Sequence, residues 1–410
     1  MRRVAALCLL LAACDDGAVD AGPDAGPDLG CPVAGACLEN PERPGFSPPV
    51  VVAPSPDLPA EVVSQTAHNN LDVVLHDGRL FLALRTAPSH FASADTWLYV
   101  VSTTDQVAWR YEGGFHLGRD LREPRFLSIN GELSLYFAVL GTDPLAFEPG
   151  GARVARYRGP GDWTPPVEAF ADLPGFIPWR IQRHGDEAWL IGYVGGEGVY
   201  TAEVDPLRVY WLKTRDGQAW APVAPTGAQV LEGGVSETDF ARLDDGTIIA
   251  VGRNEAGDAD GFGSKICRGE AATPGVWRCV ADPRKPDSPL VLTDGARVWL
   301  VGRRHVTEDG HFDLGREDLP PEQQWATYLA AYWSRPKRCA LWSVDATRLA
   351  VTHVLDLPSA GDTCFASAVP LGDRQWLLYN YSSPFDRPDI SWIQGQRGPT
   401  LIYQTTLALP

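Results

Sequence analysis

The 410-residue sequence has little of three things: methionine, positive charge and long apolar runs. It contains one Met, and after its first fifteen residues no apolar run approaches the roughly 20 residues that a membrane-spanning helix needs. Its 35 Lys and Arg face 52 Asp and Glu, a net charge of −17. Because phosphate contacts need a basic face, nucleic acid is not expected as a partner. Long helical periodicity is nearly absent, whereas 41 Gly, 35 Pro and 14 Trp are typical of an all-β chain with many turns.

Motifs of metal and nucleophile chemistry are also missing. The chain has no C-x-x-C pair, and its eight His form no metal-ligand spacing. It has no Gly-x-Ser-x-Gly either. We therefore expect no metal site and no cofactor.

The first residues predict export. Arg2 and Arg3 precede an apolar run over residues 4–13, and Leu11-Ala12-Ala13-Cys14 follows. This resembles the lipobox of bacterial lipoproteins, in which the signal is cut before the cysteine and the cysteine carries lipid. The resemblance implies a signal peptide over 1–13, a lipid on Cys14 and a periplasmic or cell-surface location. Membrane association would then run through the lipid alone. A plain secretory signal is the alternative, and it also exports the chain.

Residues 14–48 are predicted to be a disordered tether, and residues 49–410 a folded domain. The first stretch is acidic and rich in Pro, Gly and Ala, so it cannot bury enough apolar surface to offset its ordering entropy. The folded part is long enough to bury a large core, and we expect a monomer.

Six cysteines remain after the signal and the lipid site are set aside. An even count in an exported chain indicates disulfides. The local pairs are predicted to be Cys31–Cys37 and Cys267–Cys279, which leaves Cys339–Cys364.

A repeated pattern predicts the fold. A turn rich in Asp, Asn and Gly is followed at once by an apolar, strand-like run, six times in all; the copies are 76–84, 130–138, 185–193, 245–252, 294–302 and 372–380. Successive turns start about 53, 55, 60, 49 and 78 residues apart. Asp-Gly and Asn-Gly between apolar runs are strong hairpin signals, because Gly and Asn tolerate positive φ.

Each copy also has a second strand, predicted at 97–102, 154–157, 209–213, 265–267, 340–344 and 400–405. Six such antiparallel units fit a six-bladed β-propeller of four-stranded blades. Residues 49–53 are predicted to supply the last strand of the last blade. A pair of β-sandwiches is the competing architecture, but it does not explain a unit that recurs six times.

Two segments carry a family resemblance. Thr214-Arg-Asp-Gly-Gln-Ala-Trp220 fits the Asp-box pattern loosely, and Thr103-Thr-Asp-Gln-Val-Ala-Trp109 is a worn copy. Together with Glu237, the following Asp244-Asp-Gly246 and Arg253, they make residues 60–407 resemble the sialidase superfamily of six-bladed propellers. That family has an axial pocket with an Arg cluster, an acid/base Asp and a Tyr nucleophile activated by a Glu.

The resemblance implies roles for individual residues. Glu237 matches the activating Glu, Asp95 the acid/base Asp, Arg253 one Arg of the cluster and Arg303 a weaker match for another, with Arg304 beside it. Arg85, at the end of the predicted first inner strand, resembles an accessory sugar-contacting Arg. The stretch Arg119-Asp120-Leu-Arg122-Glu123-Pro124 precedes the second inner strand, so either Arg122 or Glu123 is expected to point at the axis. Asp120 is a further acid/base candidate. The pocket entrance is then predicted to hold Asn70, Arg122, Arg180, Glu237 and Arg253.

Two departures weaken the match to an active sialidase. The expected Arg-Ile-Pro before the first inner strand is replaced by 68–71, which reads His-Asn-Asn-Leu. Phe365 stands where the Tyr is expected, and a side chain without a hydroxyl is no nucleophile.

Each candidate also has a structural interpretation. Arg253 and Arg303 could reach solvent at strand ends, and Glu237 could bind a turn. Asp95 could cap a loop. Asp120 and Arg122 could form an ion pair between blades.

Two hypotheses follow. The hypothesis ranked first is a surface-displayed propeller that binds a glycan or glycoprotein, with acidic glycans among the candidates. It does not carry out sialidase catalysis. The second is an active exo-glycosidase, in which Glu237 and Asp95 or Asp120 form the acid/base pair.

Overall fold

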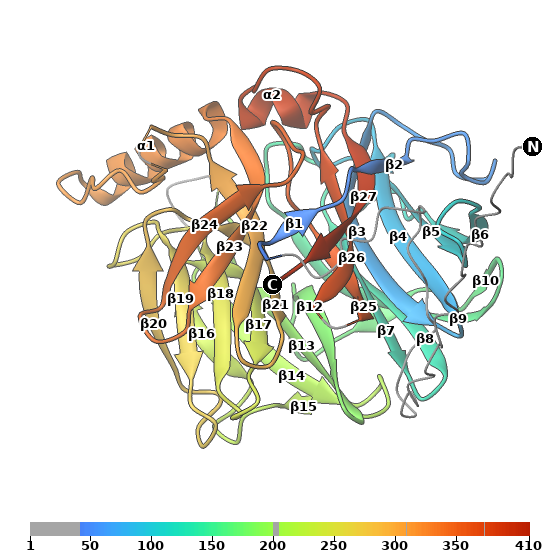
Figure 1. The fold of residues 1–410 in the computed structure, drawn as a ribbon, viewed down its shortest axis with the longest axis horizontal. Coiled ribbons are helices and arrows are strands. Elements are labelled where there is room, and N and C mark those ends of the chain that lie inside the picture. Colours follow the sequence, from blue (N-terminus) through green and yellow to red (C-terminus); the bar gives the residue numbers. More distant parts are fainter. Residues whose placement is uncertain (1–41, 200–204, 309, 373) are drawn as a thin grey trace, which may run out of the picture.

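A computed structural model describes residues 42–410 except 200–204, 309 and 373. The predicted signal peptide, Cys14, the Cys31–Cys37 pair and nearly all of the predicted tether lie outside these residues. Within the described part the chain forms six antiparallel sheets arranged as the blades of a propeller (Figure 1). The predicted six-bladed, all-β fold is confirmed.

The blades follow one another along the chain. Blade 1 contains β3 (Ala67–His76), β4 (Arg79–Ala87), β5 (Trp97–Thr103) and β6 (Arg110–Phe115), and blade 2 contains β7 (Asp120–Ile129), β8 (Glu132–Leu140), β9 (Pro149–Gly159), β10 (Asp162–Trp163) and β11 (Val167–Ala169). Blade 3 contains β12 (Ile177–His184), β13 (Glu187–Val194), β14 (Leu207–Thr214), β15 (Ala221–Pro222) and β16 (Gln229–Gly233). Blade 4 contains β17 (Val235–Arg242), β18 (Ile248–Asn254), β19 (Ser264–Gly269) and β20 (Trp277–Asp282), and blade 5 contains β21 (Asp287–Thr293), β22 (Val298–His305), β23 (Lys337–Asp345) and β24 (Ala350–Asp356). Blade 6 contains β25 (Ser367–Gly372), β26 (Gln375–Ser382) and β27 (Leu401–Ala408), together with β1 (Gly45–Phe46) and β2 (Val50–Ala53) from the start of the described chain.

The ring is closed by the two ends of the folded part. Both β1 and β2 pair antiparallel with β27, which is the third strand of the last blade (Figure 1). The predicted closing strand at 49–53 is therefore confirmed. Strand β1 lies within the range assigned to the tether, so pairing with the propeller begins at Gly45. The N-terminal strands β1 and β2 thus complete the blade that the C-terminal strands form, and they cover the outer edge of β27.

The Asp-Gly and Asn-Gly turns form as predicted, but they join strands other than those expected. Asp77 and Gly78 have positive φ and connect β3 to β4, with His76 paired to Arg79. The apolar runs that were predicted to be innermost, such as β4, are thus the second strands of their blades. The runs that were predicted to be second, such as β5, are the third strands. The first strands, which contact one another between neighbouring blades, lie innermost.

The innermost strands escaped detection because buried polar groups interrupt their apolar residues. Asp72 on β3 accepts hydrogen bonds from the backbone N–H of Phe126 at 2.7 Å and from the hydroxyl of Ser367 at 2.6 Å, which ties three blades together. Asp239 on β17 accepts from the N–H of Val291 on β21 at 2.7 Å. Arg125 is fully buried over the rings of Trp179 and Phe365. Such a polar axis hides the strand periodicity from a hydrophobicity pattern.

Both predicted Asp-box segments form the same hydrogen-bonded turn. The hydroxyl of Thr214 accepts from the N–H groups of Asp216 and Gly217, while Asp216 accepts from the next two N–H groups. Thr103 and Asp105 repeat this pattern. Each turn follows the third strand of its blade. That these turns belong to the Asp-box class remains a prediction.

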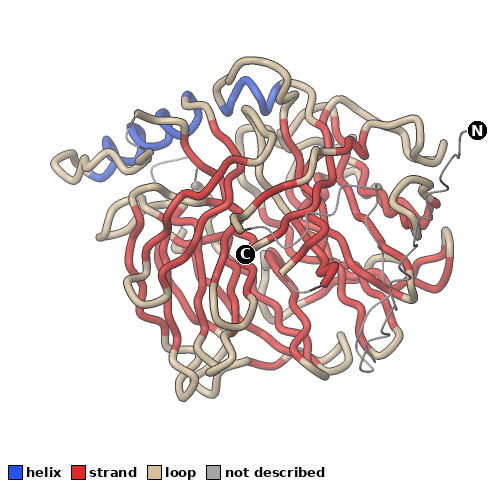
Figure 2. The backbone as a smooth tube through the Cα atoms, viewed as in Figure 1, coloured by secondary structure: helices blue, strands red, loops and turns tan. Residues whose placement is uncertain are grey.

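One blade carries an insertion, which explains the long spacing between the last two repeats. Residues 306–336 separate β22 from β23 and contain helix α1 (Pro321–Ser334). Together with α2 (Trp392–Arg397), it lies at one end of the propeller (Figure 2). An aromatic cluster fastens α1 to the blades; its buried members are Phe262, Phe312, Tyr328, Tyr332 and Trp392. The sequence reasoning missed this helix.

The predicted disulfides Cys267–Cys279 and Cys339–Cys364 are both formed. The first links neighbouring strands β19 and β20, and the second links β23 to the segment before β25. Disulfides persist in oxidising compartments, so they indicate an extracellular or periplasmic location. Helices long and apolar enough to cross a membrane do not occur in the described part of the chain.

Candidate functional site

A pocket opens at the end of the propeller that carries both helices. It encloses about 1030 Å³, open mouth included, and takes side chains from all six blades and both helices. Its polar and aromatic lining comprises Asn70, His90, Phe91, Arg122, Glu123, Phe147, Tyr193, Glu237, Arg253, Glu255, Ser288, Arg303, Trp333, Phe365, Tyr381, Trp392 and Gln396. The ring of blades thus gathers groups that lie up to 326 residues apart in sequence, from Asn70 to Gln396.

Irregularities in the innermost strands place many of these side chains. The pairing of each innermost strand from β3 to β21 shifts register near its first residues. Asn70, Glu123, Glu237 and Ser288 occupy positions skipped by these shifts, and all four line the pocket. Asn70, Glu123 and Ser288 also have positive φ. A bulge re-aims a side chain out of the regular alternation, which is why these residues reach the pocket.

Glu237 is the centre of a charged network. One carboxylate oxygen accepts from Nη1 of Arg253 at 2.7 Å, and the other accepts from the hydroxyl of Ser288 at 2.9 Å. Arg253 also pairs with Glu255 at 3.0 Å. Burial lowers the pKa of Arg253, but the charges of Glu237 and Glu255 outweigh it and raise that pKa. The predicted neighbours Glu237 and Arg253 therefore meet, and the guanidinium is already matched by carboxylates.

Glu123 supplies a second carboxyl group to the same pocket. It accepts from the side-chain amide of Asn70 at 3.2 Å. Burial raises its pKa to about 7, and the negative charge of Glu237 adds to this rise, although Arg125 and Arg122 oppose it. Glu123 is therefore the carboxyl group whose protonated form is favoured, whereas Glu237 is ion-paired with Arg253.

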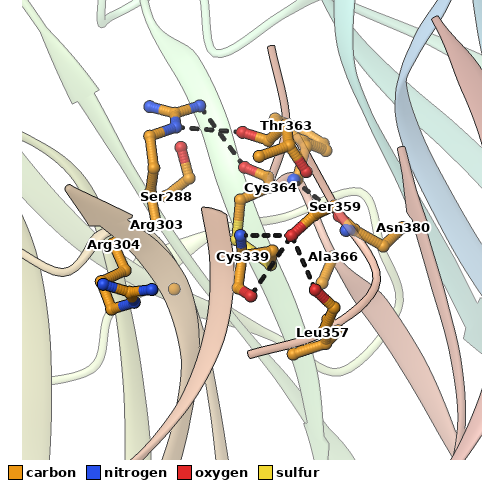
Figure 3. The surroundings of a disulfide bond; sticks show 12 residues. Ser288, Arg303, Arg304, Cys339, Leu357, Ser359, Thr363, Cys364, Ala366 and Asn380 are labelled. Atoms are coloured by element: carbon orange, nitrogen blue, oxygen red, sulfur yellow. Dashed lines mark hydrogen bonds between the residues drawn. A yellow bond between two sulfur atoms is a disulfide. The ribbon is translucent and has the colours of Figure 1, made fainter. Parts of the chain in front are cut away.

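Arg303 is held by the segment that the second disulfide anchors. Its Nε donates to the carbonyl of Thr363 at 3.0 Å, and its Nη1 donates to the hydroxyl of Tyr332 at 2.8 Å. Figure 3 shows the guanidinium directed at the carbonyls of Thr363 and Cys364. Arg304 instead pairs with Asp356 on β24. Arg303 thus lines the pocket as predicted, but carbonyl and phenol oxygens occupy its donors.

A hydrogen-bonded chain forms another part of the wall. Asp362 accepts from the hydroxyl of Tyr381 at 2.8 Å and lies 2.6 Å from Nδ1 of His90. Burial lowers the pKa of His90 despite the nearby Asp362, so the ring is neutral at pH 7. Burial also raises the pKa of Tyr381. Tyr381 lines the pocket together with Phe365, which occupies the position where a Tyr was expected.

Three predicted residues form a buried cluster at the boundary between blades 1 and 2. Arg85 is fully buried and donates to Asp120 at 2.7 Å. Arg122 also pairs with Asp120, at 2.5 Å. Asp120 and Arg122 therefore form the predicted ion pair, but both lie on β7, and the pair that joins two blades is Arg85 with Asp120. Of the three residues, only Arg122 lines the pocket; the others are enclosed behind it.

Two further predicted residues lie away from the pocket wall. Asp95 is exposed in the loop before β5, and its backbone carbonyl accepts from Gln65. Arg180 is buried near the axis, where it donates to the carbonyl of Pro289 at 2.9 Å and lies 3.4 Å from Asp239. Asp95 and Arg180 therefore do not join the groups around Glu237.

The sequence reasoning missed several members of the lining. Glu255, Ser288 and His90 were not singled out, and Glu123 was named only as an alternative to Arg122. The signal that was available is positional: Glu255 follows Arg253 by two residues, just past the end of β18, and alternation along an extended chain directs both side chains to the same side. His90, Trp333 and Trp392 come from loops and the insertion, where no repeat position marks them.

Comparison with known proteins identifies the architecture. No family model and no curated protein sequence matches the chain. Among solved structures, a protein of unknown function from Dyadobacter fermentans aligns with a TM-score of 0.55 and 13% identity, over 84% of this chain and 95% of that one. A Trypanosoma rangeli sialidase in complex with sialic acid aligns with a TM-score of 0.54 and 12% identity, over 84% of this chain.

The fold is similar to the sialidase propeller. The alignment covers only 54% of the Trypanosoma rangeli sialidase, so this chain spans about half of that protein. An α-L-arabinofuranosidase from Fusarium graminearum also aligns, with a TM-score of 0.49, 11% identity and coverage of 83% of this chain and 93% of that one. The likeness to the Dyadobacter fermentans and Trypanosoma rangeli proteins, at 13% and 12% identity, establishes the fold alone.

Proposed function

We propose that this protein is an extracytoplasmic glycoside hydrolase that acts on the end of a neutral glycan. Glu123 is the general acid and Glu237 is the carboxylate that works opposite it. The observation that carries the proposal is that both carboxyl groups line one pocket in different surroundings: Glu123 is held by Asn70 and burial raises its pKa, whereas Glu237 is ion-paired with Arg253. Two carboxyl groups with separated roles are what glycoside hydrolysis needs.

The charges around the pocket favour a neutral ligand over an acidic one. Three arginines line it, and so do three glutamates. Arg253 is matched by Glu237 and Glu255, Arg122 by Asp120, and Arg303 by backbone carbonyls and Tyr332. A substrate carboxylate would have to displace these partners, whereas sugar hydroxyls can add to them. The pocket therefore does not offer the free Arg cluster that an acidic sugar needs.

The reaction follows from the two carboxyl groups. The protonated Glu123 donates its proton to the glycosidic oxygen as the bond to the anomeric carbon breaks. The carboxylate of Glu237 takes a proton from the water that attacks that carbon from the opposite face. This inverting route needs no tyrosine nucleophile, in keeping with Phe365.

Substitution of each glutamate tests the proposal. We expect the wild-type protein to release sugar from a panel of neutral oligosaccharides, and Glu237→Gln to lower kcat by at least about a hundredfold. Glu123→Gln should lose hydrolysis of natural glycosides but retain it for nitrophenyl glycosides, whose leaving group needs no proton. Glu232→Gln, an exposed position on β16, is the matched control and should leave rates unchanged. Equal rates for wild type and Glu237→Gln would refute this mechanism.

A binding function without hydrolysis is the second candidate. It is supported by Phe365 at the expected tyrosine position and by the occupation of both Glu237 oxygens by Arg253 and Ser288. Calorimetry with the same panel separates the two functions. Binding of a neutral glycan that the wild-type protein leaves intact over days would establish the binding function and exclude the hydrolase.

A further inference from the structure

A smaller side pocket joins the main pocket beside helix α1. We define the side pocket by the residues that line it: Val199, Arg253, Glu255, Phe262, Lys285, Phe312, Trp325, Tyr328, Leu329, Tyr332, Trp333 and Trp392. Arg253, Glu255, Trp333 and Trp392 line both pockets, so the two lie side by side and share these residues as a common wall. A ligand that occupies both pockets would pass over these four residues.

Helix α1 presents a partly exposed apolar stripe to the side pocket. Trp325, Leu329 and Trp333 are spaced four residues apart and so share one face of the helix. All three are half-buried, whereas Tyr328 and Tyr332 on the adjacent face are buried against the propeller. Tyr328 and Tyr332 anchor α1 most deeply, although the indole N–H of Trp325 also donates to the carbonyl of Val199 at 3.2 Å and Trp333 packs against the aromatic cluster. The half-buried faces of Trp325, Leu329 and Trp333 line the side pocket.

The polar groups of the side pocket indicate what kind of ligand fits. The indole N–H of Trp392 is buried, and no described residue accepts its hydrogen bond. Arg253 and Glu255 add charged donors and acceptors to the same wall. Flat aromatic faces together with hydrogen-bonding groups match a sugar ring, which has apolar C–H faces and a rim of hydroxyls. A purely apolar ligand would supply no hydrogen-bonding group to this polar wall.

We infer that the side pocket binds a second unit of the same glycan, so that the substrate is an oligosaccharide and not a single glycoside. One sugar occupies the main pocket beside Glu123 and Glu237. Its neighbour stacks on the tryptophans of α1 and contacts Arg253 and Glu255 at the wall that the two pockets share. This inference rests on the proposed function and narrows its substrate to chains of at least two neutral units.

Affinity as a function of chain length tests the inference. The protein is the full mature chain carrying Glu123→Gln, which prevents turnover during calorimetry. The probes are neutral oligosaccharides of one to four units built from glucose, xylose, mannose, galactose or arabinose. For the sugar that binds, we expect the affinity to rise about tenfold from one unit to two, the order of magnitude of one stacking contact.

Trp325 gives the decisive variant because it lines the side pocket and not the main one. Trp325→Ala should weaken disaccharide binding about tenfold and change monosaccharide binding less than twofold, while Trp325→Phe restores most of the loss. Trp277→Ala on the outer strand β20 is the control and should change neither affinity. The melting temperature of each variant shows that it is folded.

The outcomes separate this inference from the proposed function. A protein that binds the monosaccharide as tightly as the longer chains overturns the inference and leaves the glycan-binding pocket standing. So does a Trp325→Ala variant with unchanged disaccharide affinity. If no neutral sugar of any length binds, the proposed function itself fails, and the inference fails with it.

Discussion

Removal of the Cys339–Cys364 disulfide should loosen one wall of the pocket as well as lower stability. The bridge joins β23 to the segment that carries Thr363 and Phe365. The carbonyl of Thr363 holds Arg303, and the ring of Phe365 lies 4.5 Å from the guanidinium carbon of Arg125. The perturbation is the double substitution Cys339→Ala/Cys364→Ala.

The stability cost follows from the loops that the disulfides close. Cys339 and Cys364 are 25 residues apart, whereas Cys267 and Cys279 are 12 apart. The chain-entropy relation then gives a loss of about 3.5 kcal/mol for the first bridge and about 3 kcal/mol for the second. Because the two costs are similar, Cys267→Ala/Cys279→Ala is a matched control for loss of global stability.

Two assays distinguish the variants. Urea denaturation followed by circular dichroism measures the free energy of unfolding. Hydrogen exchange measures local opening in residues 360–366, where the N–H of Phe365 donates to the side chain of Asn380 at 3.1 Å. We expect faster exchange in this segment only when Cys339 and Cys364 are replaced. Equal exchange in both double variants would refute the idea that this bridge positions the pocket wall.

Three further predictions address the acid, the buried ion pair and the anchor. Glu123 acts in its protonated form and its pKa is about 7, so kcat should fall about tenfold per pH unit above pH 7. A flat profile of kcat from pH 6 to 9 would contradict its role as the acid. Arg85→Met leaves Asp120 buried with one partner fewer and should lower the free energy of unfolding by about 3 to 5 kcal/mol. The double substitution Arg85→Met/Asp120→Asn should lower the free energy of unfolding by less, and calorimetric melting of both variants tests this order. Cys14→Ser should abolish labelling by radioactive palmitate and release the protein from the membrane fraction, and persistent labelling would disprove lipidation at Cys14.

The site was only partly predictable, and the reasons are particular. Glu237 and Arg253 were found because one precedes and the other ends a hairpin whose Asp-Gly turn is obvious in the sequence. Glu123 was left as an alternative because its exposure depends on a bulge, and bulges leave no mark on hydrophobic alternation. Asp120 and Arg85 were predicted to line the pocket because charged side chains at strand ends were expected to point toward the propeller axis. Their mutual pairing satisfies both side chains behind the wall.

The sequence by itself determined the number of blades, the positions of the hairpin turns, the strand that closes the ring and the pairing of the two disulfides that the structure describes. These features are local, or they repeat, so they are written in residue types at fixed spacing. Only the tertiary structure decided which strands are innermost, which charges face the pocket and where the inserted helix lies. Those features depend on contacts between blades, where a side chain is defined by neighbours tens or hundreds of residues away. The pocket exists because closure of the ring brings these distant side chains to one end of a common axis.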